Sequence, residues 1–235
     1  MSASGYFPHG VLVADAPLDA RVAFVRRTYL HLTAAIVGFV LLSTVFFYAG
    51  VGVAILQLIA GSRPGWLLVL GGFMVAGWIA NTLAQSPGSQ AKQYAGLGLY
   101  TVAEAIIFSP MLALAALLPG VLPTAAAITV ITFGGLSIYV LTSRQDFSFL
   151  KTGLLVASIV ALGLIVAGAL FGFHLGIWFS GAMILLAAGS ILYSTSKIVH
   201  HYEVDQHVAA ALELFAAVAL LFWYVLRFVM ELQRR

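Results

Sequence analysis

The stretch Val208–Met230 reads VAAALELFAAVALLFWYVLRFVM, an apolar run that contains only two charged residues, Glu213 and Arg227. A helix needs about 20 apolar residues to cross about 30 Å of hydrocarbon, so this run is long enough to span a bilayer. It contains no glycine or proline at which the chain could turn back inside the membrane. The run therefore predicts a full transmembrane helix, the last one in the chain.

Six further apolar runs of similar length precede it, and short connections rich in glycine, proline and serine separate them. Open sheets do not span lipid, because their unpaired backbone groups find no water there, and these runs are too long for barrel strands. We therefore expect an all-α integral membrane protein with seven transmembrane helices in one membrane domain, residues 1–235. The expected spans are approximately 29–48, 65–83, 94–118, 121–141, 153–173, 177–196 and 208–230.

The composition excludes several classes of protein. Of the 235 residues, 62% are hydrophobic and only 8% are charged, against roughly a quarter charged in a soluble domain. Eleven Lys and Arg residues are too few for a nucleic-acid surface, so membrane lipid is the expected partner. The absence of cysteine excludes disulfides, thiolate metal sites and cysteine nucleophiles. The oligomeric state is not set by the sequence.

The distribution of Lys and Arg predicts the orientation. Residues 1–26 precede the first apolar run without a cleavage signature, which indicates a cytoplasmic tail rather than a signal peptide. With this tail inside, most Lys and Arg residues of the short loops also lie inside. Seven spans place Arg227, Arg234 and Arg235 outside, whereas a last segment that enters and returns would place them inside. We favour seven spans, because early charges usually dominate orientation.

Two acids lie within predicted spans, where a charge is costly and a functional role is the default hypothesis. Glu104 lies in mid-span with Tyr100 one turn earlier, and Pro110 beyond it frees a backbone carbonyl, so we expect a polar cavity there. Glu213 lies on a face of the last span that is rich in alanine, which is typical of close helix packing. The alternative is that both acids are structural, either protonated or hydrogen-bonded.

Asp146 follows Arg144 in the connection between the fourth and fifth spans. A functional role at the cytoplasmic mouth is one interpretation. The alternative is a capping box, because Ser143 precedes Asp146 by three residues and an acid near a helix N-terminus is favourable without any function.

A histidine-rich stretch precedes the last span on the same side. It contains His200, His201, Asp205 and His207, which we interpret as a pH-sensing mouth. A plain solvated loop is the alternative. The spacing matches no zinc pattern with a defined second half, so we expect no metal centre.

The sequence lacks residues that three classes of enzyme or pump require. A retinal protein needs a lysine in the last span, and Val208–Met230 has none. The histidines cluster at loops, away from the intramembrane serines that a protease would need. There is no glycine-rich phosphate loop followed by lysine. We therefore expect neither catalytic residues nor an ATP-driven step.

Five motifs make the chain resemble the Bax inhibitor-1 family. They are RVAFVRRTY (21–29), AEAIIFSPML (103–112), TSRQDFSFL (142–150), ILYSTSKIVHHY (191–202) and VDQHVAAALELF (204–215). The resemblance covers nearly the whole chain after Asp19, and the motifs are similar to those of the bacterial branch. It implies six helices around a central seventh, a bacterial inner-membrane location, and a pH-sensitive calcium leak controlled by two aspartates.

The sequence departs from that family where the two aspartates are expected. Asp146 matches the first aspartate, but Ser194 occupies the position of the second, and Ala217 stands where many relatives carry an acid. The arginine that pairs with the aspartates also has no counterpart in the second span, where Asn81 is the nearest polar residue. Two close carboxylates titrate as a coupled pair. A single Asp146 beside Arg144 and Ser194 would instead have a lowered pKa, so the gate should lose its response near neutral pH.

Two functions follow from these observations. The first is a passive, pH-influenced calcium or cation leak, with Glu104 and Glu213 in its interior and Asp146, Arg144 and Ser194 at its gate. Calcium would bind weakly, since flexible sites usually supply six to eight oxygens, and no other cofactor is implied. The second is a non-conducting membrane modulator that binds a membrane protease or a stress-response protein. In that case the acids are structural.

Overall fold

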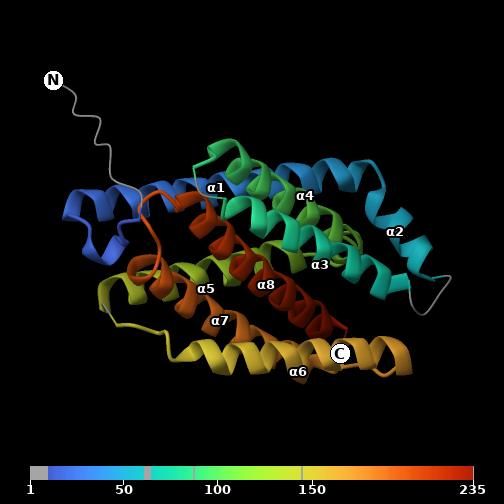
Figure 1. Cartoon of the computed structure of the whole chain (residues 1–235). Coiled ribbons are helices and arrows are strands. Elements are labelled where there is room, and N and C mark those ends of the chain that lie inside the picture. Colours follow the sequence, from blue (N-terminus) through green and yellow to red (C-terminus); the bar gives the residue numbers. More distant parts are fainter. Residues whose placement is uncertain (1–9, 61–64, 87, 144, 235) are drawn as a thin grey trace.

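Seven long apolar helices form the bundle seen in the computed structural model, which describes residues 10–60, 65–86, 88–143 and 145–234 (Figure 1). The prediction of an all-α protein with seven spans is confirmed, and the chain is a multi-pass membrane protein. The spans are α1 (Leu18–Tyr48), α3 (Gly65–Ala84), α4 (Gln90–Ala115), α5 (Val121–Ser143), α6 (Leu150–Phe171), α7 (Gly176–His200) and α8 (His207–Gln233).

Three features of the first part of the chain differ from the sequence prediction. Helix α1 begins at Leu18, eleven residues before the predicted span, so part of the expected tail is helical. A short turn, η1 (Val13–Asp15), precedes it. A short apolar helix, α2 (Val51–Ala60), follows α1 after Gly50, whose φ of +73° suits glycine. Ten residues are too few to span a bilayer, which is why the run was not recognised.

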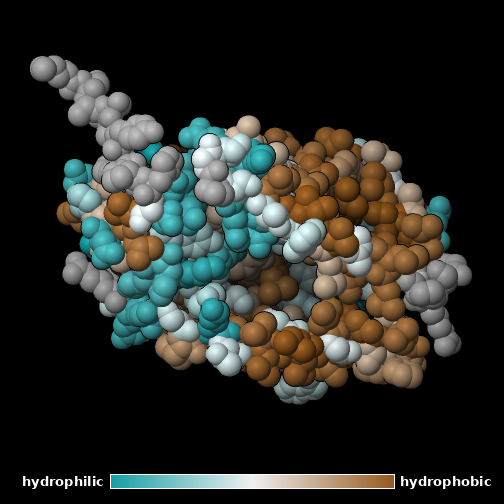
Figure 2. Space-filling view, viewed as in Figure 1, coloured by the Kyte–Doolittle hydropathy of each residue, from teal (hydrophilic) through white to brown (hydrophobic). Residues whose placement is uncertain are grey.

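The seven spans alternate in direction, so α8 ends at the opposite end of the bundle from the start of α1 (Figure 1). A last segment that enters and returns is therefore wrong. We call the end where α1 and α8 begin the basic end, since most of the cationic side chains in the described residues lie there. They are Arg21, Arg26, Arg27, Lys92, Lys151 and Lys197. Figure 2 shows hydrophilic side chains gathered at this end and a hydrophobic surface over most of the rest.

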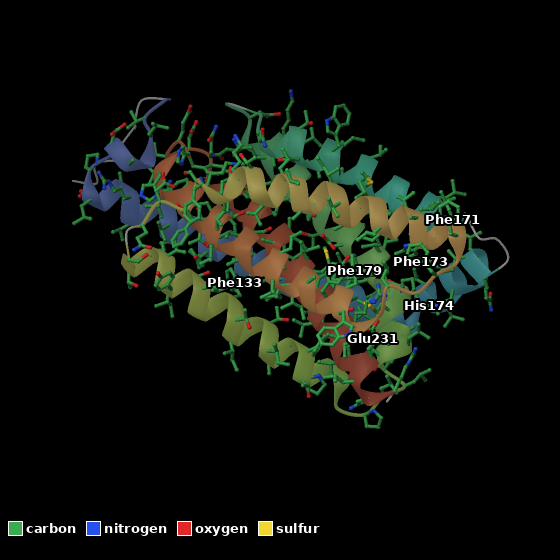
Figure 3. All side chains as sticks on the ribbon, turned by 90° about the horizontal axis from the view of Figure 1, so that it is seen from below. Phe133, Phe171, Phe173, His174, Phe179 and Glu231 are labelled. Carbon is green, nitrogen blue, oxygen red and sulfur yellow. The ribbon has the colours of Figure 1, made fainter. Side chains whose placement is uncertain are left out.

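Helix α8 is the most buried span. Of the residues in its apolar stretch, 72% are buried inside the protein, against 6% in the apolar stretch of α6. It packs against α1, α3, α4, α5 and α7. Figure 3 shows α7 between α5 and α6, and α6 packs mainly on α7. A ring of six helices around the seventh is therefore not confirmed, although α8 is the inner helix of the bundle.

Small residues allow the closest helix contacts. Ala209, Ala210 and Ala217 on α8 are buried, as the alanine-rich face predicts. Gly96 on α4 faces the backbone of α3, where an added Cβ would lie 2.6 Å from the nitrogen of Ala84. This tight pairing of α3 with α4 fixes one wall of the central cavity described next.

Candidate functional site

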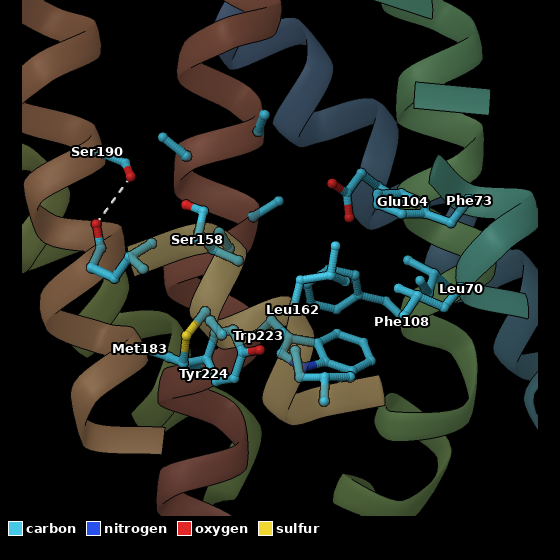
Figure 4. A pocket seen from close by; sticks show the side chains of 18 of the residues that line it. Leu70, Phe73, Glu104, Phe108, Ser158, Leu162, Met183, Ser190, Trp223 and Tyr224 are labelled. Atoms are coloured by element: carbon cyan, nitrogen blue, oxygen red, sulfur yellow. Dashed lines mark hydrogen bonds between the residues drawn. The ribbon is translucent and has the colours of Figure 1, made fainter. Parts of the chain in front are cut away.

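A cavity of about 590 Å³ lies in the middle of the bundle, between α3, α4, α6, α7 and α8 (Figure 4). We call it the central cavity. Most of its walls are aliphatic or aromatic. Its polar lining residues are Tyr100, Glu104, Ser158, Ser190, Ser194, Glu213, Tyr224 and Arg227.

Glu104 provides a buried carboxylate in this cavity, and its side chain points from α4 into the space between the helices (Figure 4). The residue is 5% exposed. Tyr100, one turn earlier on α4, is a hydrogen-bonding partner of the carboxylate. Thr101, the other polar neighbour, donates instead to the carbonyl of Leu97 at 2.8 Å. The predicted cavity beside Glu104 is therefore present, and the carboxylate belongs to its wall.

Glu213 is held by three donors at the basic end of the cavity. Lys197 Nζ lies 2.8 Å from Glu213 Oε2, and the Tyr202 hydroxyl donates to the same oxygen at 2.5 Å. Ser194 Oγ donates to Glu213 Oε1 at 3.1 Å. These contacts join the last turns of α7, the following connection and the second turn of α8. We call Ser194, Lys197, Tyr202 and Glu213 the Glu213 cluster.

Tyr202 lies outside the spans, in the connection between α7 and α8. Burial, and then the negative charge of Glu213, raise the pKa of Tyr202 well above its ordinary value. Its hydroxyl therefore stays protonated and remains a donor to Glu213. The backbone around Tyr202 is clamped by the N-terminal segment, since Val13 N–H donates to the Tyr202 carbonyl at 2.8 Å and Val204 N–H donates to the Val11 carbonyl at 3.2 Å.

A second cavity of about 400 Å³ adjoins the first toward the basic end. Glu213 and Tyr100 line both cavities, while Lys197, Asn81 and Gln85 line only the second. The Lys197–Glu213 ion pair thus lies between the central cavity and the polar side chains of Asn81 and Gln85 near the end of α3.

Asp146 lies apart from the Glu213 cluster. Its Oδ1 accepts from the backbone N–H of Ser148 at 2.9 Å, from the Ser148 hydroxyl, and from Ser196 Oγ at 3.1 Å. The hydroxyl and then the N–H of Ser148 hold the pKa of Asp146 below its usual value. The expected direction is confirmed, but the cause is Ser148, and Arg144 lies outside the described residues.

Two sequence interpretations of this region are wrong. Ser194 does not contact Asp146, because Ser194 donates to Glu213 and Ser196 takes the place beside Asp146. Ser143 and Asp146 do not form a capping box, since Ser143 is the last residue of α5 and its hydroxyl bonds to Val140 at 3.4 Å. Asp146 instead fixes the turn that leads into α6.

The members of the histidine-rich stretch lie in different surroundings. His200 is half-buried, with Nδ1 2.9 Å from the carbonyl of Ser196, and His201 is exposed. His207 is buried and packs edge-on against His31 of α1, with ring centroids 4.9 Å apart. Asp205, between them, lies in the connection and is partly buried.

Sequence reasoning missed Lys197, Tyr202 and Ser196. Lys197 follows Ser194 by three residues, so both were predictable on one face of α7. Tyr202 gave no such signal, because its contact with Glu213 depends on the path of the connection. Among the described residues, no group of three or more His, Asp or Glu side chains is arranged to hold a metal ion.

Comparison with known protein families gives one match over residues 21–235, to the family described as inhibitor of apoptosis-promoting Bax1. The chain is also similar to individual proteins. The modulator of FtsH protease YccA from Escherichia coli is 31% identical over 160 residues, which cover 66% of this chain and 69% of that protein.

Two other relatives differ in how much they align. An uncharacterized protein of Pseudomonas aeruginosa is 36% identical over 105 residues, 43% of this chain and 46% of its own length, so the alignment spans about half of that relative. Bax inhibitor 1 of Schizosaccharomyces pombe is 27% identical over 232 residues, 97% of this chain and 83% of its own.

Proposed function

The chain belongs to the Bax inhibitor-1 family, and from that premise we propose that it is a passive cation pathway rather than an enzyme, with calcium as the ion. The observation that carries the proposal is the central cavity, which two carboxylates line and where one of them, Glu213, pairs with Lys197. Glu104 lies within the cavity, and Glu213 lies where the cavity meets the basic end.

The carboxylates provide the attraction that a cation needs in a low-dielectric interior. An inward-facing acid lowers the cost of bringing a positive charge to mid-membrane, where a charge is otherwise expensive. The lining offers too few oxygens for the six to eight ligands of a tight calcium site. Weak binding favours passage through the cavity over storage in it.

The Glu213 cluster is proposed as the gate. The ion pair of Lys197 with Glu213 joins α7 to α8 across the route from one cavity to the next. The gate would open where the contact between Lys197 Nζ and Glu213 Oε2 breaks. Ser194 stands where the family resemblance places the second aspartate, and the Lys197–Glu213 ion pair takes over the gating role in this proposal.

The basic end is proposed to face the cytoplasm of a bacterial cell. Short cytoplasmic loops carry an excess of Lys and Arg in membrane proteins, and in the described residues the basic end holds more of them than the opposite end, where Arg227 and Arg234 lie. A relative of this chain is named an inner membrane protein, which supports the same location.

Calcium flux into liposomes that contain the purified chain tests the proposal, measured with a trapped dye at pH 6, 7 and 8. We expect flux above that of empty liposomes, and a several-fold reduction with Glu104→Gln, because this substitution removes the charge from the cavity. Glu203→Gln is the matched control, because Glu203 is an acid in the connection between α7 and α8 and lines neither cavity.

Flux equal to that of empty liposomes at every pH would contradict conduction. It would favour a second function, a modulator of a membrane protease, which is supported by the relative named modulator of FtsH protease. Degradation of a membrane substrate by the Escherichia coli FtsH protease, reconstituted with and without the chain, measures that function directly. In that case Glu104→Gln and Glu213→Gln should leave the effect on the protease intact.

A further inference from the structure

The central cavity has the size of a small-molecule site. Its volume of about 590 Å³ lies within the range of about 300–1,000 Å³ that ligand pockets occupy, and such pockets combine apolar walls with a few placed polar groups. A pathway for small inorganic ions alone does not require so large an apolar space. The apolar lining therefore favours a ligand with an apolar body.

Six aromatic side chains from three helices line this cavity. They are Trp66, Phe73, Tyr100, Phe108, Trp223 and Tyr224. Trp66 and Trp223 stack with their ring centroids 6.1 Å apart, and Phe108 meets Trp223 edge-on at 4.9 Å. Aromatic faces attract organic cations, and groups of them form the cages that bind quaternary ammonium groups.

Glu104 supplies a carboxyl group in the same space. Its carboxylate points into the cavity, near Phe73 and Phe108 (Figure 4). Among the described residues no lysine or arginine pairs with it, since Lys197 is bound to Glu213 and Arg227 to Glu231. A bound cation would provide the partner that the protein itself does not.

The cavity opens sideways rather than only along the bundle axis. Helices α3 and α6, which form its two edges, approach each other over few residues. Figure 2 shows a hollow on this face, between the hydrophilic end and the hydrophobic band. A molecule dissolved in the bilayer could enter here without crossing the polar end, so the ligand should be lipophilic.

We infer that the central cavity is a binding site for a lipophilic organic cation, an amine or quaternary ammonium with an aromatic or alkyl body. The charged nitrogen lies against Glu104 and the aromatic faces, and the apolar body fills the space toward Trp223 and Tyr224. Inorganic dications lack the apolar body, and anionic amphiphiles would be repelled by Glu104. This inference shares the cavity with the proposed function but does not depend on conduction.

Equilibrium binding to the full chain in nanodiscs of zwitterionic lipid tests the inference. The probe is tritium-labelled 4-phenylbutyl-trimethylammonium, and the comparison is its neutral counterpart with carbon in place of nitrogen. After subtraction of empty nanodiscs, we expect saturable binding of one cation per chain and no saturable binding of the neutral compound.

Substitutions locate the site. Glu104→Gln should weaken binding of the cation by about tenfold or more, because it removes the buried charge partner. Trp223→Leu should weaken it about threefold to tenfold, since one cation–π partner is lost. Glu203→Gln, at an acid that lines neither cavity, should bind like the unchanged chain.

Equal saturable binding of the cation and the neutral compound would overturn the inference, because the cavity would then select only apolar bulk. Absence of saturable binding would also overturn it. Both readouts use the unchanged chain, so they decide the matter even if Glu104→Gln fails to fold. Calcium flux on the same preparation separates the two proposals, since binding without flux contradicts conduction alone and flux without binding contradicts this inference alone.

Discussion

Lys197 Nζ lies 2.8 Å from Glu213 Oε2, and this ion pair joins the end of α7 to the start of α8. The two side chains are 34% and 24% exposed, so the pair is neither fully buried nor fully hydrated. Such a pair can break without unfolding the protein. That property suits a gate better than a purely structural tie, because a gate has to open and close many times.

Lys197→Met should raise calcium flux several-fold at pH 7, because the contact that we propose as the gate between the two cavities is lost. The cost in stability should be small, about 1 kcal/mol or less, since partly exposed ion pairs contribute little. Flux in liposomes and thermal unfolding in detergent measure the two effects. Lys92→Met, at an exposed position of the same end, is the control. Lower flux in Lys197→Met than in the unchanged chain would contradict the gate.

Tyr202→Phe should lower the free energy of unfolding by about 1.5–3 kcal/mol, the typical contribution of a hydrogen bond to a charged group. The raised pKa of Tyr202 means that its neutral form is favoured in the folded state. The stability from this hydroxyl is therefore present below pH about 10, the unfolded value, and is lost as the pH rises toward the folded value.

Thermal unfolding from pH 8 to 11 measures this effect. The difference between the unchanged chain and Tyr202→Phe should shrink above pH 10. Tyr48→Phe, at a side chain that is 84% exposed, should show no such difference. If the difference in stability between the unchanged chain and Tyr202→Phe is the same at all pH values, ionisation of Tyr202 is not coupled to folding.

Asp146→Asn should leave the pH profile of calcium flux unchanged between pH 6 and 8. The lowered pKa of Asp146 keeps the carboxylate ionised throughout this range, and its contribution to stability is lost only as the pH falls below about 4. Flux at closely spaced pH values measures the profile, with the unchanged chain measured alongside. A shifted midpoint in Asp146→Asn would return Asp146 to the gate.

The spans were predictable because hydrophobic length is a local property of the sequence. The start of α1 was not, since charges at Asp19, Arg21 and Arg26 exclude those residues from lipid but do not prevent them from forming a helix. A span and a helix are different things, and only the span can be read from hydropathy. Helix α2 was missed for the related reason that an apolar helix of ten residues is too short to count as a span.

The candidate site was predicted in part. Glu104 and Glu213 face the interior, as helical periodicity suggested. The predicted contact between Asp146 and Ser194 was wrong. Ser194 and Ser196 are about 200° apart around α7, at 3.6 residues per turn, so they point to nearly opposite sides. Which of them faces Asp146 depends on the rotation of α7 against its neighbours. That rotation is set by packing between distant segments, which no local pattern contains.

Val13→Ala should lower the free energy of unfolding by on the order of 2 kcal/mol and raise calcium flux. Val13 is fully buried, and its N–H holds the carbonyl of Tyr202 at 2.8 Å. A looser N-terminal clamp would release Tyr202 and so weaken the Glu213 cluster. Leu12→Ala, at a neighbouring side chain that is 39% exposed, is the control for thermal unfolding and flux. Equal effects of the two substitutions would contradict a specific clamp.

Gly96→Ala should destabilise the protein by about 1–3 kcal/mol, the usual cost of overpacking a tight contact. An added Cβ would overlap the carbonyl oxygen of Ala80 and lie 2.6 Å from the nitrogen of Ala84. Both are backbone atoms of α3, so neither can move aside as a flexible side chain would. The helix would have to shift, and because α3 and α4 form walls of the central cavity, ligand binding and flux should change as well.

Gly98→Ala provides the matched comparison on the same helix. Nothing lies within 4 Å of an added Cβ at Gly98, and alanine is the better helix former by about 1 kcal/mol. This substitution should therefore leave stability unchanged or raise it slightly. Thermal unfolding of both variants in one detergent tests the contrast. A similar loss of stability in both variants would mean that alanine is unfavourable in this part of α4 for a reason other than the contact with α3. The close pairing of α3 and α4 would then not explain the shape of the cavity.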